Sequence, residues 1–326
     1  MIGAHHSRPA VRGRVVILLR WIAALAVLAL LFHFLPFAPL RAALSRVPGT
    51  RFLAALIGYL LAHTIGVFKW RMVVNAAGAD LDFSTSAQCY TGGLFGTLFL
   101  PSIIGGDAVR LAVGLRRSPR PASVLAGNIT DRFLDVTALA TLALTGIFLL
   151  PGSLPAGWQA AARHRLLIVG AIAVAAALLL LILRRPILRG RSVRFRRRLG
   201  RFRYGLRSVS RRPHVLVFGW MLGLLIQGSF LTLNALLGIS CGLILPLRAW
   251  LLAWPLAKLA ALLPITQGGI GVREAALVAL LAPFGAPGPL VLAAGLVWEG
   301  VIISGGLVGG LIALILHRVE EPPEKP

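Results

Sequence analysis

The sequence has very few acidic residues. Only ten of its 326 residues are Asp or Glu, whereas 34 are Lys or Arg, which gives a formal net charge of +24. Charged residues make up 13% of the chain and hydrophobic residues 57%, a balance that excludes an ordinary soluble globular protein. Because the basic residues cluster between long apolar runs, we interpret them as determinants of membrane topology, and we expect no nucleic acid as a partner.

The sequence also lacks the motifs of common enzymes and metal sites. There is no P-loop, no GxSxG and no HExxH motif. The two cysteines, Cys89 and Cys241, have no partner spacing, and the seven histidines are scattered. We therefore predict no catalytic residue, no metal and no cofactor.

Long apolar runs recur from end to end of the chain. The short alternating segments of a β-barrel are absent, so we predict an all-α, polytopic membrane helix bundle. Before the first run come three arginines, and the run is too long for a cleaved signal peptide, so we expect an uncleaved first helix. Six full spans are predicted, at about 15–35, 52–68, 124–150, 166–183, 215–237 and 290–316.

One string, LPxxxGGxxVR, occurs twice, at residues 100–110 and 263–273. Pro removes a backbone donor, adjacent Gly residues loosen a helix, and Arg in hydrocarbon is costly unless it has a partner. Two copies of such a string suggest two broken helices that face each other around a polar site, as in transporters built from repeats.

The apolar stretch before each string is too short for a full span. About 15 residues precede Pro101, or about 22 Å of helix, against a hydrocarbon core of about 30 Å. We therefore predict two re-entrant hairpins in addition to the six spans. With the N-terminus and the basic segments 69–71, 116–120 and 184–212 in the cytoplasm, the hairpins open to opposite sides and form an inverted repeat, although Arg41, Arg46 and Arg51 fall outside. Both termini, including residues 1–14, are then cytoplasmic.

The most basic stretch, 184–212, contains 13 Arg and no acidic residue. Within it, an apolar stripe recurs at intervals of three and four residues, which predicts a helix lying in the membrane interface against anionic lipid. The simpler alternative is a solvated loop that only sets topology. The stripe consists of Phe195, Leu199, Phe202, Leu206 and Val209.

Residues 317–326 are expected to be a disordered tail.

Half of the acidic residues fall within or at the edge of apolar segments, and several cations do too. Ionisable groups inside a membrane usually line a pathway or a binding site, so we expect the cations to hold a phosphate. Helix ends freed at the broken strings would add N–H donors. The alternative is a set of ion pairs that only fix helix packing. These residues are Asp107, Asp131, Asp135, Glu274 and Glu299, with Arg110, Arg132, Lys258, Arg273 and, less deeply, Arg71.

Asp131 and Asp135 are one helical turn apart and share a face. Such a pair could hold Mg²⁺ on a diphosphate, but sites of that kind generally need further carboxylates, and no second Asp pair exists. The alternative is that Arg132 or Arg110 neutralises them.

The segments LPSIIGGDAVR, NITDRFLD and LPITQGGIGVREAAL resemble the lysylphosphatidylglycerol synthase transmembrane (flippase-like) family, over about residues 15–316. The family's full synthases add a soluble aminoacyl-transfer domain, which we do not expect in the ten residues after Leu316. The resemblance therefore implies the membrane half alone, which in the family moves a lipid or a lipid-linked sugar between leaflets. By motif, it implies a site made of Gly105, Gly106, Asp107, Arg110, Asp131, Arg132, Gly268, Gly269, Arg273 and Glu274, to which the buried charges add Lys258 and Glu299.

From these observations we expect a flippase-like protein of a bacterial plasma membrane that binds a phospholipid or a lipid-linked anionic substrate and moves it between leaflets. Membrane lipids are its expected partners. Two alternatives stay open: a metal-dependent intramembrane enzyme that acts on a lipid phosphate, and a non-catalytic membrane partner of a soluble lipid-modifying enzyme.

Overall fold

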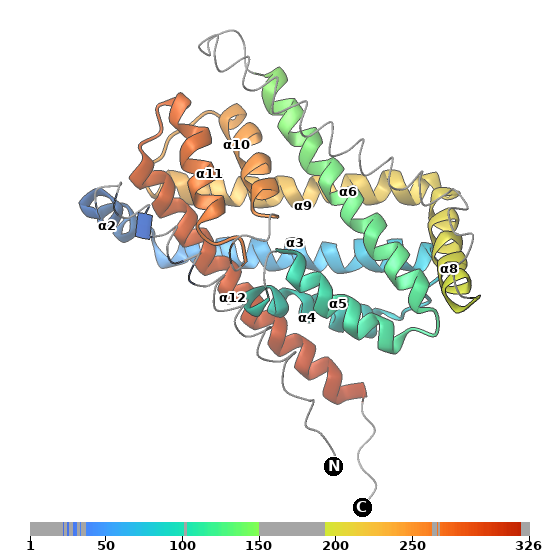
Figure 1. Ribbon diagram of the computed structural model, residues 1–326. Helices are drawn as coiled ribbons and strands as arrows, with labels where there is room; N and C mark the ends of the chain where they lie inside the picture. Colours follow the sequence, from blue (N-terminus) through green and yellow to red (C-terminus); the bar gives the residue numbers. More distant parts are fainter. Residues whose placement is uncertain are drawn as a thin grey trace, which may run out of the picture.

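The computed structural model is a bundle of helices (Figure 1). It describes residues 37–100, 103–149, 193–262, 266 and 268–320, with a few positions between 22 and 33. Every regular element in this part of the chain is helical, which confirms the predicted all-α fold. The predicted span at 166–183 lies outside the described residues, and the span at 15–35 lies largely outside them.

Two long antiparallel helices set the length of the bundle. Helices α3 (Gly49–Ala76) and α9 (Pro213–Ser240) each have 28 residues, or about 42 Å at 1.5 Å per residue. They lie side by side in Figure 1, and the Arg51 side chain donates a hydrogen bond of 2.9 Å to the Ser240 hydroxyl at one end. With α12 (Gly288–Glu320), they are the three helices in the described residues that are long and apolar enough to cross a membrane.

Helix α6 (Pro121–Phe148) also has 28 residues, but it carries Asp131, Arg132 and Asp135 near its middle. It begins with Pro121, which is favourable in the first turn because that turn has no helical partner for the missing N–H. In Figure 1, α6 and α12 run obliquely across the bundle. The charged middle of α6 is thereby held inside the protein, where Asp131 is buried.

The first hairpin consists of α4 (Phe83–Phe99) and α5 (Ile103–Arg117). Both of its open ends lie beside the loop that follows α3, where the Ser118 hydroxyl donates a hydrogen bond of 2.7 Å to the Ala79 carbonyl. The chain turns back at Leu100, whose backbone is extended, so the helix breaks there as predicted. Gly105 and Gly106, however, lie within α5, and the expectation that they break the helix is wrong.

The second hairpin consists of α10 (Leu247–Ala260) and α11 (Val272–Leu281), followed by the short 3-10 helix η1 (Ala282–Phe284). It follows the C-terminal end of α9, which lies at the end of the bundle opposite the first hairpin's open ends. The two hairpins therefore enter the bundle from opposite ends (Figure 1). The inverted repeat and its orientation in the membrane stay predictions.

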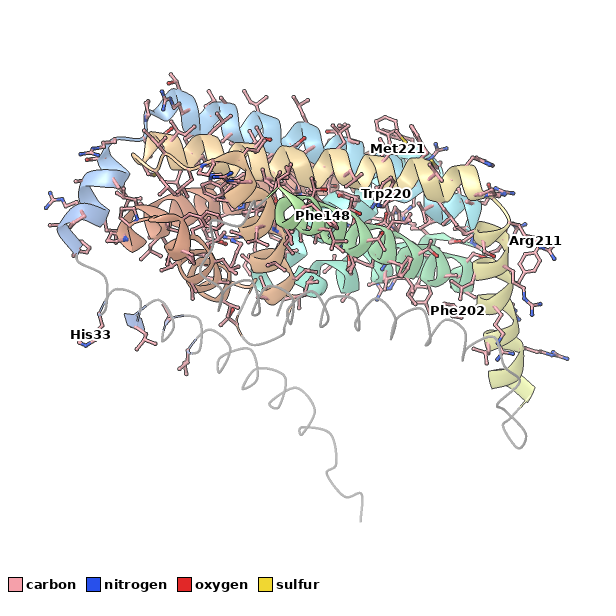
Figure 2. The ribbon with its side chains drawn as sticks, turned by 90° about the horizontal axis from the view of Figure 1, so that it is seen from above. His33, Phe148, Phe202, Arg211, Trp220 and Met221 are labelled. Carbon is pink, nitrogen blue, oxygen red and sulfur yellow. The ribbon has the colours of Figure 1, made fainter. Side chains whose placement is uncertain are left out.

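Helix α8 (Val193–Ser210) lies across one end of the bundle (Figures 1 and 2). A helix is predicted here, but the structure corrects the expected contact of its apolar stripe. Phe202 and Val209 are buried against side chains of α3, α6 and α9, and Leu199 and Leu206 pack there too. The Ser208 hydroxyl donates to the Ala76 carbonyl at 2.8 Å. This part of the stripe therefore attaches α8 to the protein and is not free for lipid.

The ends of two predicted spans need correction. Helix α3 continues eight residues past Phe68, so Lys69 lies inside the helix and is buried, although the sequence suggested a cytoplasmic charge. Helix α12 continues to Glu320, into the predicted tail. The short helix α2 (Phe37–Ser45), which the sequence did not predict, packs Leu40 and Ala43 against α12.

Candidate functional site

A cavity of about 530 Å³ lies where the two hairpins meet. Residues of α3, α4, α5, α6, α9, α10, α11 and α12 line it, so both halves of the chain contribute. The tips of the hairpins are close together: a Cβ atom on Gly268 would lie 3.5 Å from the Thr97 carbonyl oxygen. The predicted meeting of two broken helices around a polar site is therefore present.

On the side of the first hairpin, a buried lysine joins two carboxylates. The Lys69 ammonium on α3 lies 2.7 Å from a carboxylate oxygen of Asp131 and 2.6 Å from one of Asp135, both on α6. The lysine was not predicted as a site residue. Because it bridges the two carboxylates, an ion pair accounts for their one-turn spacing, with Lys69 as the main partner and the predicted arginines as secondary ones.

Two arginines complete this first cluster. Arg132 forms an ion pair with Asp107 and lies 3.4 Å from Asp135, while Arg110 lies 3.7 Å from Asp107. Arg110 also lies 3.8 Å from Asp131, and its guanidinium group stands 4.0 Å from the centre of the Tyr90 ring, a cation–π contact. Three cations thus face three carboxylates, so the cluster is neutral when all six groups are charged.

On the side of the second hairpin, one arginine forms ion pairs with two carboxylates. Arg273 on α11 contacts Glu274 through Nε at 3.0 Å and through Nη2 at 2.6 Å, and Nη2 also contacts Glu299 on α12. Glu274 also accepts a hydrogen bond of 2.7 Å from the Gly271 N–H, so it caps the start of α11. One cation here faces two carboxylates, in contrast to the balanced first cluster.

Lys258 on α10 differs from the other cations of the cavity. Its ammonium donates a hydrogen bond of 2.8 Å to the neutral amide oxygen of Gln227 and lies 4.6 Å from the centre of the Phe230 ring. Among the described residues, no carboxylate forms a salt bridge with it, whereas Lys69, Arg110, Arg132 and Arg273 each have at least one. Lys258 is therefore the cation best placed to receive an anionic group.

Aromatic side chains form another part of the cavity wall. The rings of Tyr59 and Trp298 lie 5.7 Å apart, and those of Trp254 and Trp298 lie 5.5 Å apart, both edge to face. His63 packs against Tyr59 with ring centres 4.3 Å apart, and its Nδ1 lies 3.2 Å from the Tyr90 hydroxyl. These rings give the cavity an apolar wall beside its charges.

Nine of the twelve residues predicted for the site line the cavity. The other three support the lining. Gly105 packs against Leu100 behind it, Gly269 lies at the turn before α11, and Glu274 holds Arg273 in place. The nine are Gly106, Asp107, Arg110, Asp131, Arg132, Lys258, Gly268, Arg273 and Glu299.

Several lining residues were missed as members of the site. Lys69 looked like a flanking charge because Trp70 and Arg71 follow it, yet apolar residues continue beyond them and could have shown that the span is longer. Asp135 was expected among the ionisable groups of the apolar segments and as a possible metal ligand, but it was not included among the twelve residues of the site. His63 was passed over because the histidines form no ligand pair, although a single His inside an apolar span is itself a signal of a polar site. Gln227 and the aromatic residues were not singled out.

The whole chain was compared with known protein families. The family described as Lysylphosphatidylglycerol synthase TM region matches residues 16–310. The chain belongs to this family. A comparison with curated proteins gave no match. Membership agrees with the resemblance seen in the sequence, and it identifies an integral membrane protein that is linked to lipid handling and associates with membrane lipids.

Proposed function

We propose that this protein binds the phosphate-bearing headgroup of a membrane lipid in the cavity between its hairpins and moves that lipid between leaflets. The observation that carries the proposal is Lys258, a cation in the cavity wall whose hydrogen-bond partner is a neutral amide. An anionic group beside Lys258 would pair two opposite charges, an interaction stronger than the one between the ammonium and the neutral amide of Gln227.

The shape and chemistry of the cavity support this substrate class. Its volume of about 530 Å³ falls within the range of small-molecule sites. Its wall combines fixed charges with aromatic rings, which suits a ligand with a charged head and an apolar body. A phosphate crosses hydrocarbon slowly because it must lose its water, and a wall of preplaced cations lowers that cost.

The opposite entry of the hairpins supports a transport function over a static binding site. In transporters with inverted repeats, the site lies near the bilayer midplane and opens alternately to the two sides. We propose that each hairpin closes the cavity on its own side.

The exposed arginines also support an orientation in the membrane. We propose that the end of the bundle that carries α8 is cytoplasmic, in a bacterial plasma membrane, following the positive-inside rule. The exposed arginines described at this end are Arg116, Arg117, Arg120, Arg197, Arg201, Arg207, Arg211 and Arg212.

A transport protein is also a better proposal than a metal-dependent enzyme. The sequence argument for an enzyme rested on Asp131 and Asp135, whose carboxylates both contact the Lys69 ammonium. The ion pairs with Lys69 therefore explain the spacing of the two carboxylates, and no metal-dependent reaction is needed to account for it.

The test uses the full chain in liposomes that contain a phospholipid with a fluorescent group on one acyl chain. Dithionite, added outside, bleaches only the outer leaflet, so transport exposes the remaining lipid. We expect wild-type protein to increase bleaching above the level of empty liposomes, and Lys258→Gln to reduce the rate at least tenfold. The matched control is Arg248→Gln, which removes a cation from the same helix at a position outside the cavity lining, and should stay within twofold.

Anionic phospholipids and lipid-linked sugars are tried in turn. If wild-type protein moves none of them faster than empty liposomes do, the transport proposal is wrong. If Lys258→Gln and Arg248→Gln reduce the rate equally, Lys258 is not the anion site.

A further inference from the structure

The described lining residues show one place where the cavity reaches the outer surface of the bundle. Three of its lining side chains are also widely exposed: Phe99 at the end of α4 is 54% exposed, and Ile303 and Leu307 on α12 are 42% and 53% exposed. A side chain that both lines a cavity and faces outward marks an opening. We call the gap bordered by Phe99, Ile303 and Leu307 the side opening.

The backbone explains why the opening lies there. Helices α4 and α12 are in close contact along a seam of glycines: a Cβ atom on Gly310 would lie 2.5 Å from the Phe95 ring, and one on Gly306 would lie 3.0 Å from Leu98. Helix α4 ends at Phe99, immediately after this seam, while α12 continues in the N-terminal direction. The N-terminal side of the seam therefore lacks α4 as a neighbour, which leaves Ile303 exposed.

The rim of the side opening has the chemistry of the lipid phase. Its three exposed side chains are large and apolar, and two of them belong to α12, which is long and apolar enough to cross a membrane. The charged groups lie deeper, where Arg110 and Arg273 are buried. The cavity therefore changes from charged to apolar toward its outer edge, and that gradient matches the two ends of a phospholipid.

The two ends of a lipid meet different costs in such a cavity. A phosphate held at the apolar rim would lose its water without gaining a charged partner, whereas acyl chains at the rim stay in apolar surroundings. We therefore expect a bound lipid to place its headgroup among the buried charges and its chains toward the bilayer.

We infer that the side opening is the acyl-chain site of this protein: the chains of the bound lipid pass between Phe99 and the segment of α12 that carries Ile303 and Leu307. This inference rests on the proposed function for the identity of the ligand, a lipid with an anionic headgroup. It adds the route by which that lipid enters sideways from the bilayer.

The test places a bulky ring in the opening. Ile303→Trp and Leu307→Trp narrow it, and the matched controls Leu311→Trp and Ile315→Trp lie one and two turns farther along α12, where the native side chains are 58% and 52% exposed and do not line the cavity. All four positions are exposed and apolar, so we expect the fold to tolerate a Trp at each.

Two ligands are measured on purified protein in lipid nanodiscs made of neutral phosphatidylcholine. One is fluorescent phosphatidylglycerol, which has acyl chains, and the other is soluble glycerol phosphate, which has none. We expect the two variants in the opening to bind phosphatidylglycerol at least tenfold more weakly and glycerol phosphate within twofold of wild type. The controls should bind both ligands as wild type does.

The inference is overturned if Ile303→Trp and Leu307→Trp bind phosphatidylglycerol as wild type does, or if the controls lose it equally. A different result would disprove the proposed function without affecting this inference. Wild-type protein that binds both ligands but moves no lipid in liposomes would disprove transport and leave the acyl-chain site supported.

Discussion

The two hairpins share the string LPxxxGGxxVR but use it differently. In the first, Gly105 and Gly106 lie within helix α5, and a Cβ atom on Gly106 would lie 2.5 Å from the Gly93 carbonyl oxygen. In the second, Gly268 and Gly269 lie in a turn with φ of 61° and 81°. The same pair of glycines thus allows a close contact between helices in one hairpin and a left-handed turn in the other. A repeated motif preserves the position of the cation, not the local backbone.

The charges around the two hairpins differ in the same way. The cluster of the first hairpin has three cations and three carboxylates in mutual contact, whereas on the second side Arg273 is shared by Glu274 and Glu299, and Lys258 contacts a neutral amide. Removing one partner from a network of buried ion pairs leaves a buried charge uncompensated, which is strongly destabilising, while a cation without a carboxylate is available to a ligand. We therefore expect the first cluster to matter more for stability and Lys258 more for binding.

The largest expected loss of stability comes from a substitution that breaks the first cluster. Lys69→Met leaves Asp131 and Asp135 buried without their main cation, which should cost about 3–5 kcal/mol of stability. By contrast, Lys258→Gln leaves no carboxylate unpaired and should cost less than about 1 kcal/mol. Thermal unfolding in detergent measures both.

The control for Lys69→Met is the triple variant that also carries Asp131→Asn and Asp135→Asn. It removes the uncompensated charges and should recover part of the lost stability. If Lys258→Gln destabilises the protein as much as Lys69→Met does, the assignment of stability to one side and binding to the other is wrong.

Substitutions in the two glycine pairs should cause smaller losses of stability, and these losses should differ between the hairpins. At Gly106 an added side chain meets the Gly93 backbone, so Gly106→Ala should cost roughly 1–3 kcal/mol and the larger Gly106→Asn should cost more. At Gly268 there is room for a Cβ atom, and the obstacle is the positive φ, which costs Ala about 1 kcal/mol. Asn tolerates that conformation better, so Gly268→Asn should be more stable than Gly268→Ala.

The order of Ala and Asn should therefore reverse between the two hairpins, as measured by thermal unfolding of the four variants. The same order at both positions would contradict the distinction between a packing glycine and a turn glycine.

The sequence predicted the cations of the site because their cost inside a membrane is high. Arg110 and Arg273 each lie in a repeated, otherwise apolar string, so a polar site is the simplest explanation for their presence. Lys69 was missed because Trp70 and Arg71 follow it and make it resemble the end of a span. The local sequence cannot show that Asp131 and Asp135, more than 60 residues away, neutralise it.

Packing partners were harder to predict than helices. An apolar stripe like the one that includes Phe202 and Val209 is equally consistent with contact to lipid and contact to protein, and only the folded bundle shows that α8 attaches to α3 and α6. The same ambiguity applies to Tyr59 and Trp298, because an aromatic residue in an apolar helix can face lipid, core or cavity.

The smallest expected effect concerns the shared arginine on the second side. Glu299→Gln should cost only about 1 kcal/mol, because Arg273 keeps both of its hydrogen bonds to Glu274. Asp131→Asn should cost more, because Lys69 and Arg110 both lose a charged partner. Thermal unfolding of the two variants, each compared with wild type, measures the difference. Equal losses would mean that the second cluster is as tightly coupled as the first and contributes as much to stability.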